Sequence, residues 1–326
     1  MEHTQHATGQ EFVNPAHHSY LADPFVFQWE GTFYAVGTGE SEGRPDGKLF
    51  PTLRSEDFIR WEEGEGALIP PDESLGTNFW APEIAHSDGV FYLYYSVGVE
   101  DRGHKLRVAT GRAPCGPFTD CGPLLDDPSC SFAIDPHAFQ DRDGQWYLFY
   151  ARDFLDSDRP GTSIVVAPLE GMTRISKDFT VVARAGHDWQ RFEKDRSIYG
   201  GIYDWHALEG PCMVHHEGRY YCLYTGGHWQ TERYGLDYVW SDSILGPYVD
   251  DNPGDAPRLL KTVPDLVIGP GHNSVVLGPN GLTQYIAYHA WDAKKTARRL
   301  CFDVLDWTPE GPRCLGPTYE PKVVDW

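Results

Sequence analysis

Five segments of the chain repeat one pattern, and this repetition restricts the fold more than any other feature of the sequence. Each segment has an opening motif, a short apolar strand, a turn that contains Gly and an aromatic strand, which together indicate a β-hairpin. The segments begin at Ala22, Ala81, Ile134, Glu209 and Gly271, so successive starts lie 59, 53, 75 and 62 residues apart. Strand repeats with periods above forty residues are typical of β-propeller blades. The sequence therefore predicts an all-β fold, a five-bladed β-propeller.

Weaker strand patterns follow most of the hairpins and supply outer strands for the predicted blades. Two of them, at 106–113 and 236–243, lead into Gly-Pro-aromatic sequences that favour turns. We expect about four antiparallel strands per blade and a single catalytic domain over residues 1–326. The segment 12–14 is expected to pair with the last blade and close the ring. The longest stretch without a strand pattern, 186–206, is predicted to be a loop that forms a wall of the pocket.

Three of the five opening motifs carry an acidic residue at nearly the same point. These residues are Asp23, Asp135 and Glu209. A ring of blades brings equivalent positions together around one axis, so the three carboxylates are predicted to share one pocket. Such a cluster is unfavourable unless it serves catalysis, which makes it a candidate active site. Glu83 stands two positions beyond the point of Asp23 and is not assigned to catalysis.

Composition excludes several classes of partner and places the chain in a compartment. The net charge of −21 argues against nucleic acid and anionic membranes as partners. No apolar run approaches the length of a membrane span. The first ten residues have neither the basic nor the apolar region of a signal peptide, and the seven Cys are scattered without metal-ligand spacing. We therefore expect a cytoplasmic protein with reduced thiols, and the alternative is a secreted protein whose signal peptide has been removed.

The opening motifs, taken in order, resemble those of glycoside hydrolase family 43. They read Ala22-Asp-Pro, Trp80-Ala-Pro-Glu, Ile134-Asp-Pro, Glu209-Gly-Pro and Gly271-His-Asn-Ser, and the later run 297–307 is similar too. The resemblance spans about 17 to 310. It implies a five-bladed propeller enzyme that hydrolyses α-L-arabinofuranosides or β-D-xylosides with inversion. Invertase-type propellers also use three carboxylates, but their first and fourth motifs differ.

The resemblance implies a role for each carboxylate. Asp23 matches the general base, Glu209 the general acid, and Asp135 the residue that orients the acid and raises its pKa. An inverting glycosidase needs a carboxylate that activates water and a protonated acid about 6.5–9.5 Å away. A neighbouring negative charge on Asp135 would favour the protonated form of Glu209.

Three further residues are predicted to bind substrate, each with a structural alternative. Trp80 is expected to stack on the sugar or to pack at the pocket floor. His206, three residues before Glu209, is expected to touch substrate or to pack within a loop. Arg298 matches the family arginine that reaches the sugar, while Arg299 alternates to the opposite face of the strand. The alternative for Arg298 is a solvated position at the edge of a strand.

His272 matches a histidine that, in several family members, lies near the central axis and a bound calcium. Because calcium prefers oxygen ligands, His272 is expected either to assist a hydrated calcium in the channel or to make structural hydrogen bonds. No cofactor is expected for the chemistry itself.

The resulting hypothesis is an inverting hydrolase that releases terminal α-L-arabinofuranosyl residues from oligo- or polysaccharides. A β-D-xylosidase or a galactofuranosidase of the same fold is the enzymatic alternative. The non-enzymatic alternative is a carbohydrate-binding propeller, which would need the aromatic residues but not three aligned acids.

Overall fold

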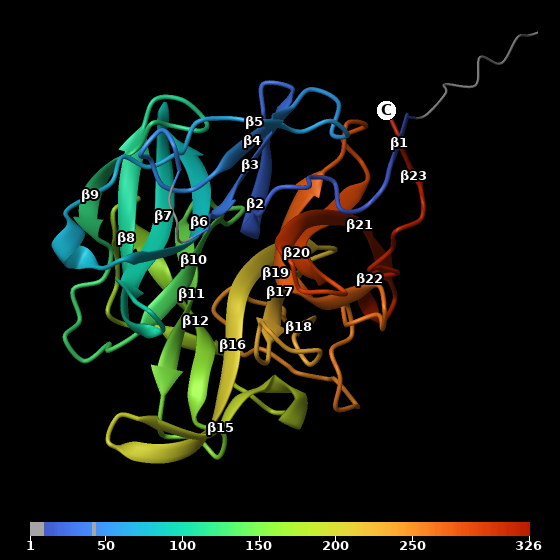
Figure 1. Cartoon of the computed structure of the whole chain (residues 1–326). Coiled ribbons are helices and arrows are strands. Elements are labelled where there is room, and N and C mark those ends of the chain that lie inside the picture. The colour runs from blue at the N-terminus through green and yellow to red at the C-terminus, as the bar shows by residue number, and fades with distance from the viewer. Residues whose placement is uncertain (1–9, 41–43) are drawn as a thin grey trace, which may run out of the picture.

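The computed structural model describes residues 10–40 and 44–326, and β-strands dominate this part of the chain (Figure 1). Its helices are two 3₁₀ turns, η1 (Glu73–Leu75) and η2 (Asp188–Gln190). Within those residues, neither helix has the length or the apolar character needed to cross a membrane. Residues 1–9, on which the expectation about a signal peptide rests, lie outside the described residues.

The strands form five antiparallel blades, which confirms the predicted fold. Blade 1 holds β2 (Ala22–Trp29), β3 (Thr32–Thr38), β4 (Thr52–Ser55) and β5 (Glu62–Glu63), and blade 2 holds β6 (Asn78–Ser87), β7 (Val90–Val99), β8 (Arg102–Gly111) and β9 (Thr119–Pro123). Blade 3 holds β10 (Ala133–Gln140), β11 (Trp146–Phe154), β12 (Gly161–Glu170) and β14 (Thr180–Ala183), with β13 (Arg174–Ile175) also paired to β12. Blade 4 holds β16 (Gly201–His216), β17 (Arg219–Gly226) and β18 (Gly235–Ser241), and blade 5 holds β19 (Val267–Leu277), β20 (Gln284–Asp292), β21 (Arg298–Thr308) and β22 (Gly311–Cys314). In blade 4 the fourth position is occupied by two isolated bridges to β18, one between Trp240 and Val249 and one between Leu236 and Leu260.

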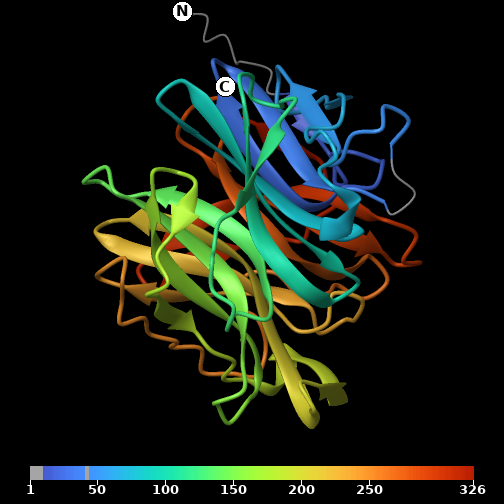
Figure 2. The same cartoon turned by 90° about the vertical axis from the view of Figure 1, so that its left-hand side faces the viewer.

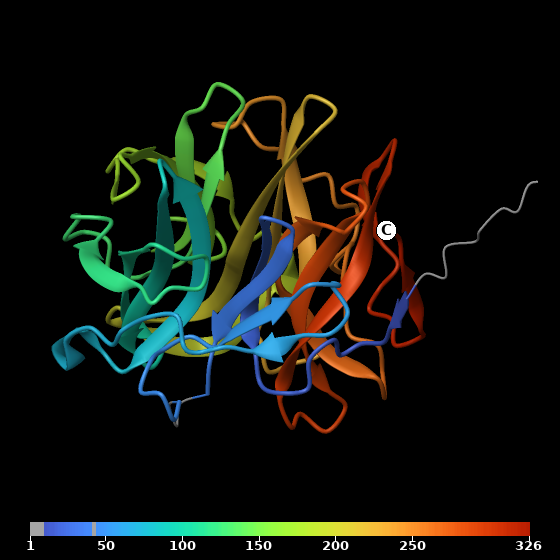
Figure 3. The same ribbon diagram turned by 90° about the horizontal axis from the view of Figure 1, so that it is seen from above.

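The blades follow one another around a ring. In Figure 1 the colours run from the blue first blade through teal, green and yellow to the red fifth blade, which returns to the first. Figure 3 shows blue β2 between the teal second blade and the orange fifth blade. The first strands of consecutive blades contact each other, and β19 contacts β2. Five first strands thus surround one central axis.

Both ends of the described chain meet beside blade 5. Strand β1 (Gln10–Phe12) pairs with β23 (Lys322–Val324). Asn14 then imitates a paired backbone: its Nδ2 donates to the Phe302 carbonyl and its Oδ1 accepts from the Phe302 N–H, both at 2.8 Å. The expected closure through residues 12–14 is therefore present, although a side chain makes much of the pairing.

Residues 186–206 differ from the expected irregular loop. They form η2, β15 (Arg191–Ile198) and the start of β16, and the two-residue turn Tyr199–Gly200 has positive φ at both positions, as hairpin turns require. The hairpin projects from the rim of the ring (Figure 2). Among the described residues that line the main cavity, none comes from this segment, so the predicted pocket wall is wrong. Because β15 is solvated on much of both faces, its charged sequence lacks the alternation that marks a half-buried strand.

Each blade bends its first strand at the same point. A β-bulge interrupts the pairing of the first and second strands, and the bulged residue has a left-handed φ between 47° and 57°. These residues are Asp23, Ala81, Asp135, Gly210 and His272. Left-handed backbone is unfavourable for residues with a Cβ, so its recurrence indicates a requirement of the fold. Bulges re-aim side chains, and here they turn each opening motif toward the axis.

The N–H groups of four bulges join neighbouring blades. Three of them donate to a side chain on the second strand of the preceding blade. The pairs are Ala81 with Thr38 Oγ1 at 2.9 Å, His272 with Thr225 Oγ1 at 2.7 Å, and Asp23 with His289 Nδ1 at 3.0 Å. In blade 3 the residue at the position of these acceptors is Ala151, whose side chain cannot accept a hydrogen bond. The Gly210 N–H donates instead to Asp135 Oδ2 at 2.9 Å. The blade contacts therefore include residues of the candidate site.

We predict that Asn14→Ala lowers the free energy of unfolding by about 2–4 kcal/mol, because it leaves the buried N–H of Phe302 without a partner and removes the bonds from Asn14 Nδ2 to the Phe302 and Thr318 carbonyls. Urea denaturation measures this change. Asn280→Ala, which removes a side chain that bonds only within the β19–β20 turn, is the control and should cost about 1 kcal/mol or less. Equal losses in the two variants would contradict the role of Asn14 in closing the ring.

Candidate active site

A cavity of about 560 Å³ opens at the end of the axis where the first strands begin. Asp23, Asp135 and Glu209 all line it, so the structure brings together the three carboxylates that the repeats place in register. The two aspartates are 8% and 6% exposed, and Glu209 is partly accessible from the cavity. Several charges are thus held close together where water is limited, which makes their protonation sensitive to their neighbours.

The three acids occupy two adjacent positions of the repeat. Asp23 and Asp135 are bulge residues, whereas Glu209 precedes the bulge at Gly210. The position of Glu209 corresponds to that of Trp80 in blade 2, which also lines the cavity. Because Gly210 contributes no side chain, the His272 imidazole can approach it: a Cβ there would lie 3.1 Å from the ring.

Asp23 is surrounded by groups that favour its ionised form. Thr38 Oγ1 donates to its Oδ2 at 2.6 Å, and Arg298 Nη1 lies 3.4 Å from its Oδ1. Burial alone would raise the pKa of Asp23, but His272, Arg298 and His289 together hold this pKa well below its usual range. Asp23 is therefore a carboxylate at every pH at which the fold is expected to work, as a base must be.

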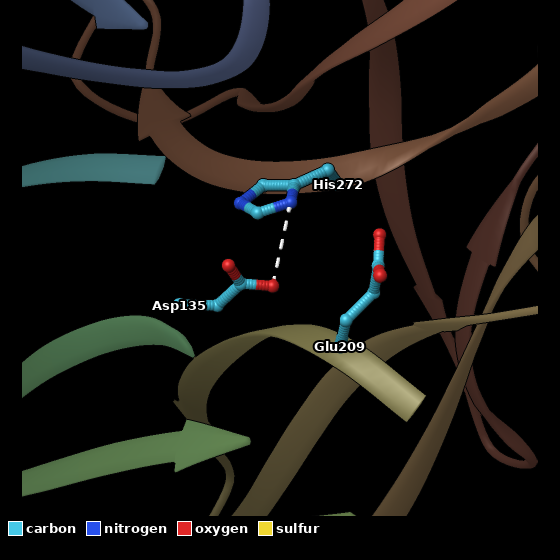
Figure 4. Close-up of side chains that lie close together, drawn as sticks. All are labelled: Asp135, Glu209 and His272. Carbon is cyan, nitrogen blue, oxygen red and sulfur yellow. Dashed lines mark ion pairs between the residues drawn. The ribbon is translucent and has the colours of Figure 1, made fainter. Parts of the chain in front are cut away.

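The surroundings of Glu209 and Asp135 favour the protonated form of these carboxyls, in contrast to those of Asp23. Figure 4 shows both side chains beside His272, and the nearest ligand atoms of the three residues lie within 4.8 Å of one another. Burial and then the charge of Asp23 raise the pKa of Glu209 to about 7, against the lowering effects of the hydrogen bond from Tyr234 and of Arg298. Burial and the charges of Glu209 and Asp23 raise the pKa of Asp135 well above its usual value.

The origin of the raised pKa differs from the expectation. The sequence suggests that the charge of Asp135 raises the pKa of Glu209, whereas burial is the first cause in the structure. Two buried carboxyls that repel each other retain a shared proton to higher pH than either would alone. The site therefore contains one ionised carboxylate and a carboxyl pair that keeps a proton near neutral pH.

Trp80 and Arg298 also lie in the cavity. The Trp80 ring stacks on His104 with centroids 3.8 Å apart, so it packs against the protein and faces the cavity as well. Arg298 Nε and Nη2 donate to Tyr20 Oη at 3.1 and 2.7 Å, and its guanidinium lies over the Trp229 ring. This bracing directs the remaining guanidinium nitrogen toward Asp23.

The structure does not bring His206 to the cavity. His206 is buried at the contact between blades 3 and 4, where its backbone pairs with Gly161 and its Nδ1 lies 3.0 Å from the Asp204 carbonyl. It stands three residues before Glu209 on one strand, and an odd offset puts side chains on opposite faces. The predicted contact with substrate has no counterpart in this arrangement.

Four residues of the site were not predicted from the sequence because they lie outside the recognised motifs: Tyr20, Trp229, Tyr234 and His289. His289 ends the aromatic strand of the fifth repeat at the position that Thr38 holds in the first, so comparison of the repeats could have found it. Tyr20 precedes the first motif, which begins at Ala22, by two residues. Trp229 and Tyr234 lie in the irregular connection between β17 and β18, where no periodicity marks them.

The side chains around His272 do not fit a protein-built calcium site. His272 Nδ1 faces Asp23 Oδ1 at 3.4 Å and Asp135 Oδ2 at 3.8 Å. Calcium takes six to eight oxygen ligands. Here one donor is a nitrogen, Asp135 Oδ2 already accepts from Gly210, and Glu209 Oε1 already accepts from Tyr234. We therefore assign no step of catalysis to a metal, and the imidazole of His272 lies between the carboxylates of Asp23 and Asp135.

Comparisons with known proteins agree with this geometry. Residues 12–312 match the family described as Glycosyl hydrolases family 43. The chain is 27% identical over 321 residues to a β-D-galactofuranosidase of Aspergillus niger, with 91% of this chain and 83% of that protein covered. It is 26% identical over 317 residues to the extracellular endo-α-(1→5)-L-arabinanase 1 of Bacillus subtilis, covering 91% and 88%. The crystal structure of a thermostable family-43 glycoside hydrolase superimposes with a TM-score of 0.82 at 27% identity, covering 96% and 98%.

The family match extends over most of the chain and through all five blades. The family hydrolyses glycosides with inversion and generally needs no cofactor for the chemistry. An ionised carboxylate and a protonated carboxyl in one cavity are the groups that this chemistry requires. On these grounds, the chain belongs to glycoside hydrolase family 43.

Proposed function

We propose that this enzyme releases terminal α-L-arabinofuranosyl residues from oligo- or polysaccharides, with Asp23 as general base and Glu209 as general acid. The observation that carries the assignment of roles is the opposite direction of their pKa shifts. Asp23 is held ionised by Arg298 and the histidines, while burial holds Glu209 protonated up to about pH 7. Two carboxyl groups with separated pKa values are the usual sign of an acid and a base.

The proposed reaction has one displacement step. Asp23 takes a proton from a water molecule as that water attacks the anomeric carbon, and Thr38 and Arg298 fix the carboxylate for this task. Glu209 gives its proton to the glycosidic oxygen as the bond to the anomeric carbon breaks. Asp135, held by the Gly210 N–H, forms a buried carboxyl pair with Glu209, and the pair retains a proton near neutral pH before reaction.

The preference for a furanoside is supported by the relatives. Two relatives that each match 91% of this chain are named as a β-D-galactofuranosidase and an endo-α-(1→5)-L-arabinanase. The first name denotes a five-membered sugar ring, and the 1→5 linkage in the second requires one, because O5 then lies outside the ring. Arg298 and Trp80 are the proposed sugar contacts: the first supplies hydrogen-bond donors and the second an aromatic face. A β-D-xylosidase or galactofuranosidase is the enzymatic alternative. A binding protein without activity would not need the separated pKa values of Asp23 and Glu209.

A panel of nitrophenyl glycosides tests the choice of sugar. We predict that kcat/KM for the α-L-arabinofuranoside exceeds that for the β-D-xyloside and the β-D-galactofuranoside by at least about tenfold, which corresponds to about 1.4 kcal/mol of transition-state binding. A preference for either of the other sugars would replace the proposed substrate and leave the acid and base assignments intact. No turnover of any glycoside, with binding retained, would support the non-enzymatic alternative.

Substitutions of the two carboxylates separate their roles. Glu209→Gln should lower kcat on a natural oligosaccharide by about a hundredfold or more, and much less on a nitrophenyl glycoside, because an activated leaving group needs little help from an acid. Asp23→Asn should reduce turnover of both substrates to background. Each variant serves as the control for the other, because only Glu209→Gln should depend on the leaving group. Full activity of Glu209→Gln on an oligosaccharide would reject Glu209 as the acid.

The stereochemical outcome is open to direct observation. We predict that the first sugar released from an α-configured substrate is the β-anomer, since water attacks the face opposite the leaving group. Proton NMR of the anomeric signal, recorded before mutarotation, distinguishes the two anomers. A product that retains the substrate configuration would require a covalent intermediate on Asp23 and would contradict its role as a base.

A further inference from the structure

Tyr234 is a buried tyrosine that contacts the proposed acid. It lies just before β18, in the connection from β17, and none of its surface is exposed. Its hydroxyl donates to Glu209 Oε1 at 2.5 Å. We propose that Tyr234 is a positioning residue that fixes which oxygen of Glu209 carries the catalytic proton and stabilises the carboxylate left after proton transfer. This inference rests on the proposed role of Glu209 as general acid.

The hydroxyl of Tyr234 acts as a donor throughout the working pH range. Burial, and then the charge of Glu209, raise the pKa of Tyr234 well above its ordinary value, so the group stays neutral. A tyrosine hydroxyl has one proton to donate, and here it points to Oε1. Oε1 is therefore an acceptor whether Glu209 is protonated or ionised. The acidic proton must then reside on Oε2, the oxygen left for the substrate.

The ring of Tyr234 is held in place on two sides. It stacks on His289 with centroids 5.8 Å apart and planes at 13°. It also packs against Gly271, where an added Cβ would lie 2.6 Å from Tyr234 Cε1. This contact gives a reason for glycine in the fifth opening motif. Because His289 in turn accepts the Asp23 N–H, one aromatic ring braces both the acid and the surroundings of the base.

The bond has a chemical consequence at each stage of the reaction. Before reaction, a donor on the carboxyl favours ionisation, so Tyr234 opposes the effect of burial and keeps the pKa of Glu209 from rising further. During reaction, the proton moves from Oε2 to the glycosidic oxygen, the electron pair of the breaking bond stays on that oxygen, and Glu209 becomes an anion. A hydrogen bond to an anion is stronger than one to a neutral acid, so the contact strengthens as the leaving group departs.

Tyr234→Phe removes the hydroxyl and keeps the ring. We expect kcat on an oligosaccharide to fall about tenfold to a hundredfold, the range for a lost hydrogen bond to a charged group. On a nitrophenyl glycoside the loss should be several-fold at most. In the wild type, activity should decline as pH rises through about 7, where Glu209 loses its proton. In Tyr234→Phe this decline should move to higher pH, because the carboxylate has lost a donor.

Tyr288→Phe is the matched control. Tyr288 is equally buried in blade 5 and its hydroxyl donates to a carboxylate, Asp303 Oδ2 at 2.8 Å, outside the cavity. Its pH profile and its dependence on the leaving group should equal those of the wild type. Circular dichroism and thermal unfolding show whether each variant is folded. If Tyr234→Phe does not fold, fluorotyrosine at position 234 keeps the shape and makes a stronger donor, and it should move the decline to lower pH.

The outcomes separate this inference from the proposal on which it rests. A folded Tyr234→Phe with an unmoved pH profile, or with equal losses on both substrates, would overturn the role of Tyr234 and leave Glu209 as the acid. An unmoved profile in the fluorotyrosine protein would have the same meaning. By contrast, full activity of Glu209→Gln on an oligosaccharide would reject the acid itself, whatever Tyr234→Phe shows.

Discussion

The left-handed bulge at the start of each first strand is the constraint on which the rest of the structure depends. At every bulge except that of Gly210 a side chain turns toward the axis, and at four of the five bulges the backbone N–H reaches a neighbouring side chain. The strained backbone is unfavourable for Asp23, Ala81, Asp135 and His272, and the ring of inter-blade hydrogen bonds offsets that cost. The same feature therefore joins the blades and aims the functional groups.

Differences among the five equivalent bulges create the site. Asp23 and Asp135 supply carboxylates, Ala81 supplies only a methyl group, and Gly210 leaves space for the imidazole of His272. In blade 3, Ala151 cannot accept the next bulge N–H, and Asp135 accepts it instead. A repeated scaffold thus becomes asymmetric through a few small residues, and this asymmetry places the acid and the base on different blades.

The electrostatics of the cavity follow from where the guanidinium of Arg298 is directed. Among the described residues, Arg298 is the arginine that pairs with a cavity carboxylate, and it pairs with Asp23. Tyr20 and Trp229 hold it there, away from the Asp135–Glu209 pair. Asp23 consequently stays ionised, whereas the pair retains a proton because burial outweighs the weaker effect of Arg298 on Glu209. An inverting glycosidase requires this separation, although buried like charges reduce the stability of the fold.

The amino-acid sequence by itself determined the five repeats, the all-β fold and the three carboxylates, because opening motifs, turn residues and aromatic strands are local features. It also identified Arg298 and His272, because the motifs that contain them resemble those of the family. Only the tertiary structure decided the orientation of His206, the conformation of residues 186–206 and the contact of Tyr234 with Glu209. Strand alternation turns His206 away from the cavity, and the solvated strand β15 turns a predicted loop into a hairpin. Tyr234 reaches Glu209 only because an irregular connection folds back over Gly271, a contact between residues that no periodicity relates.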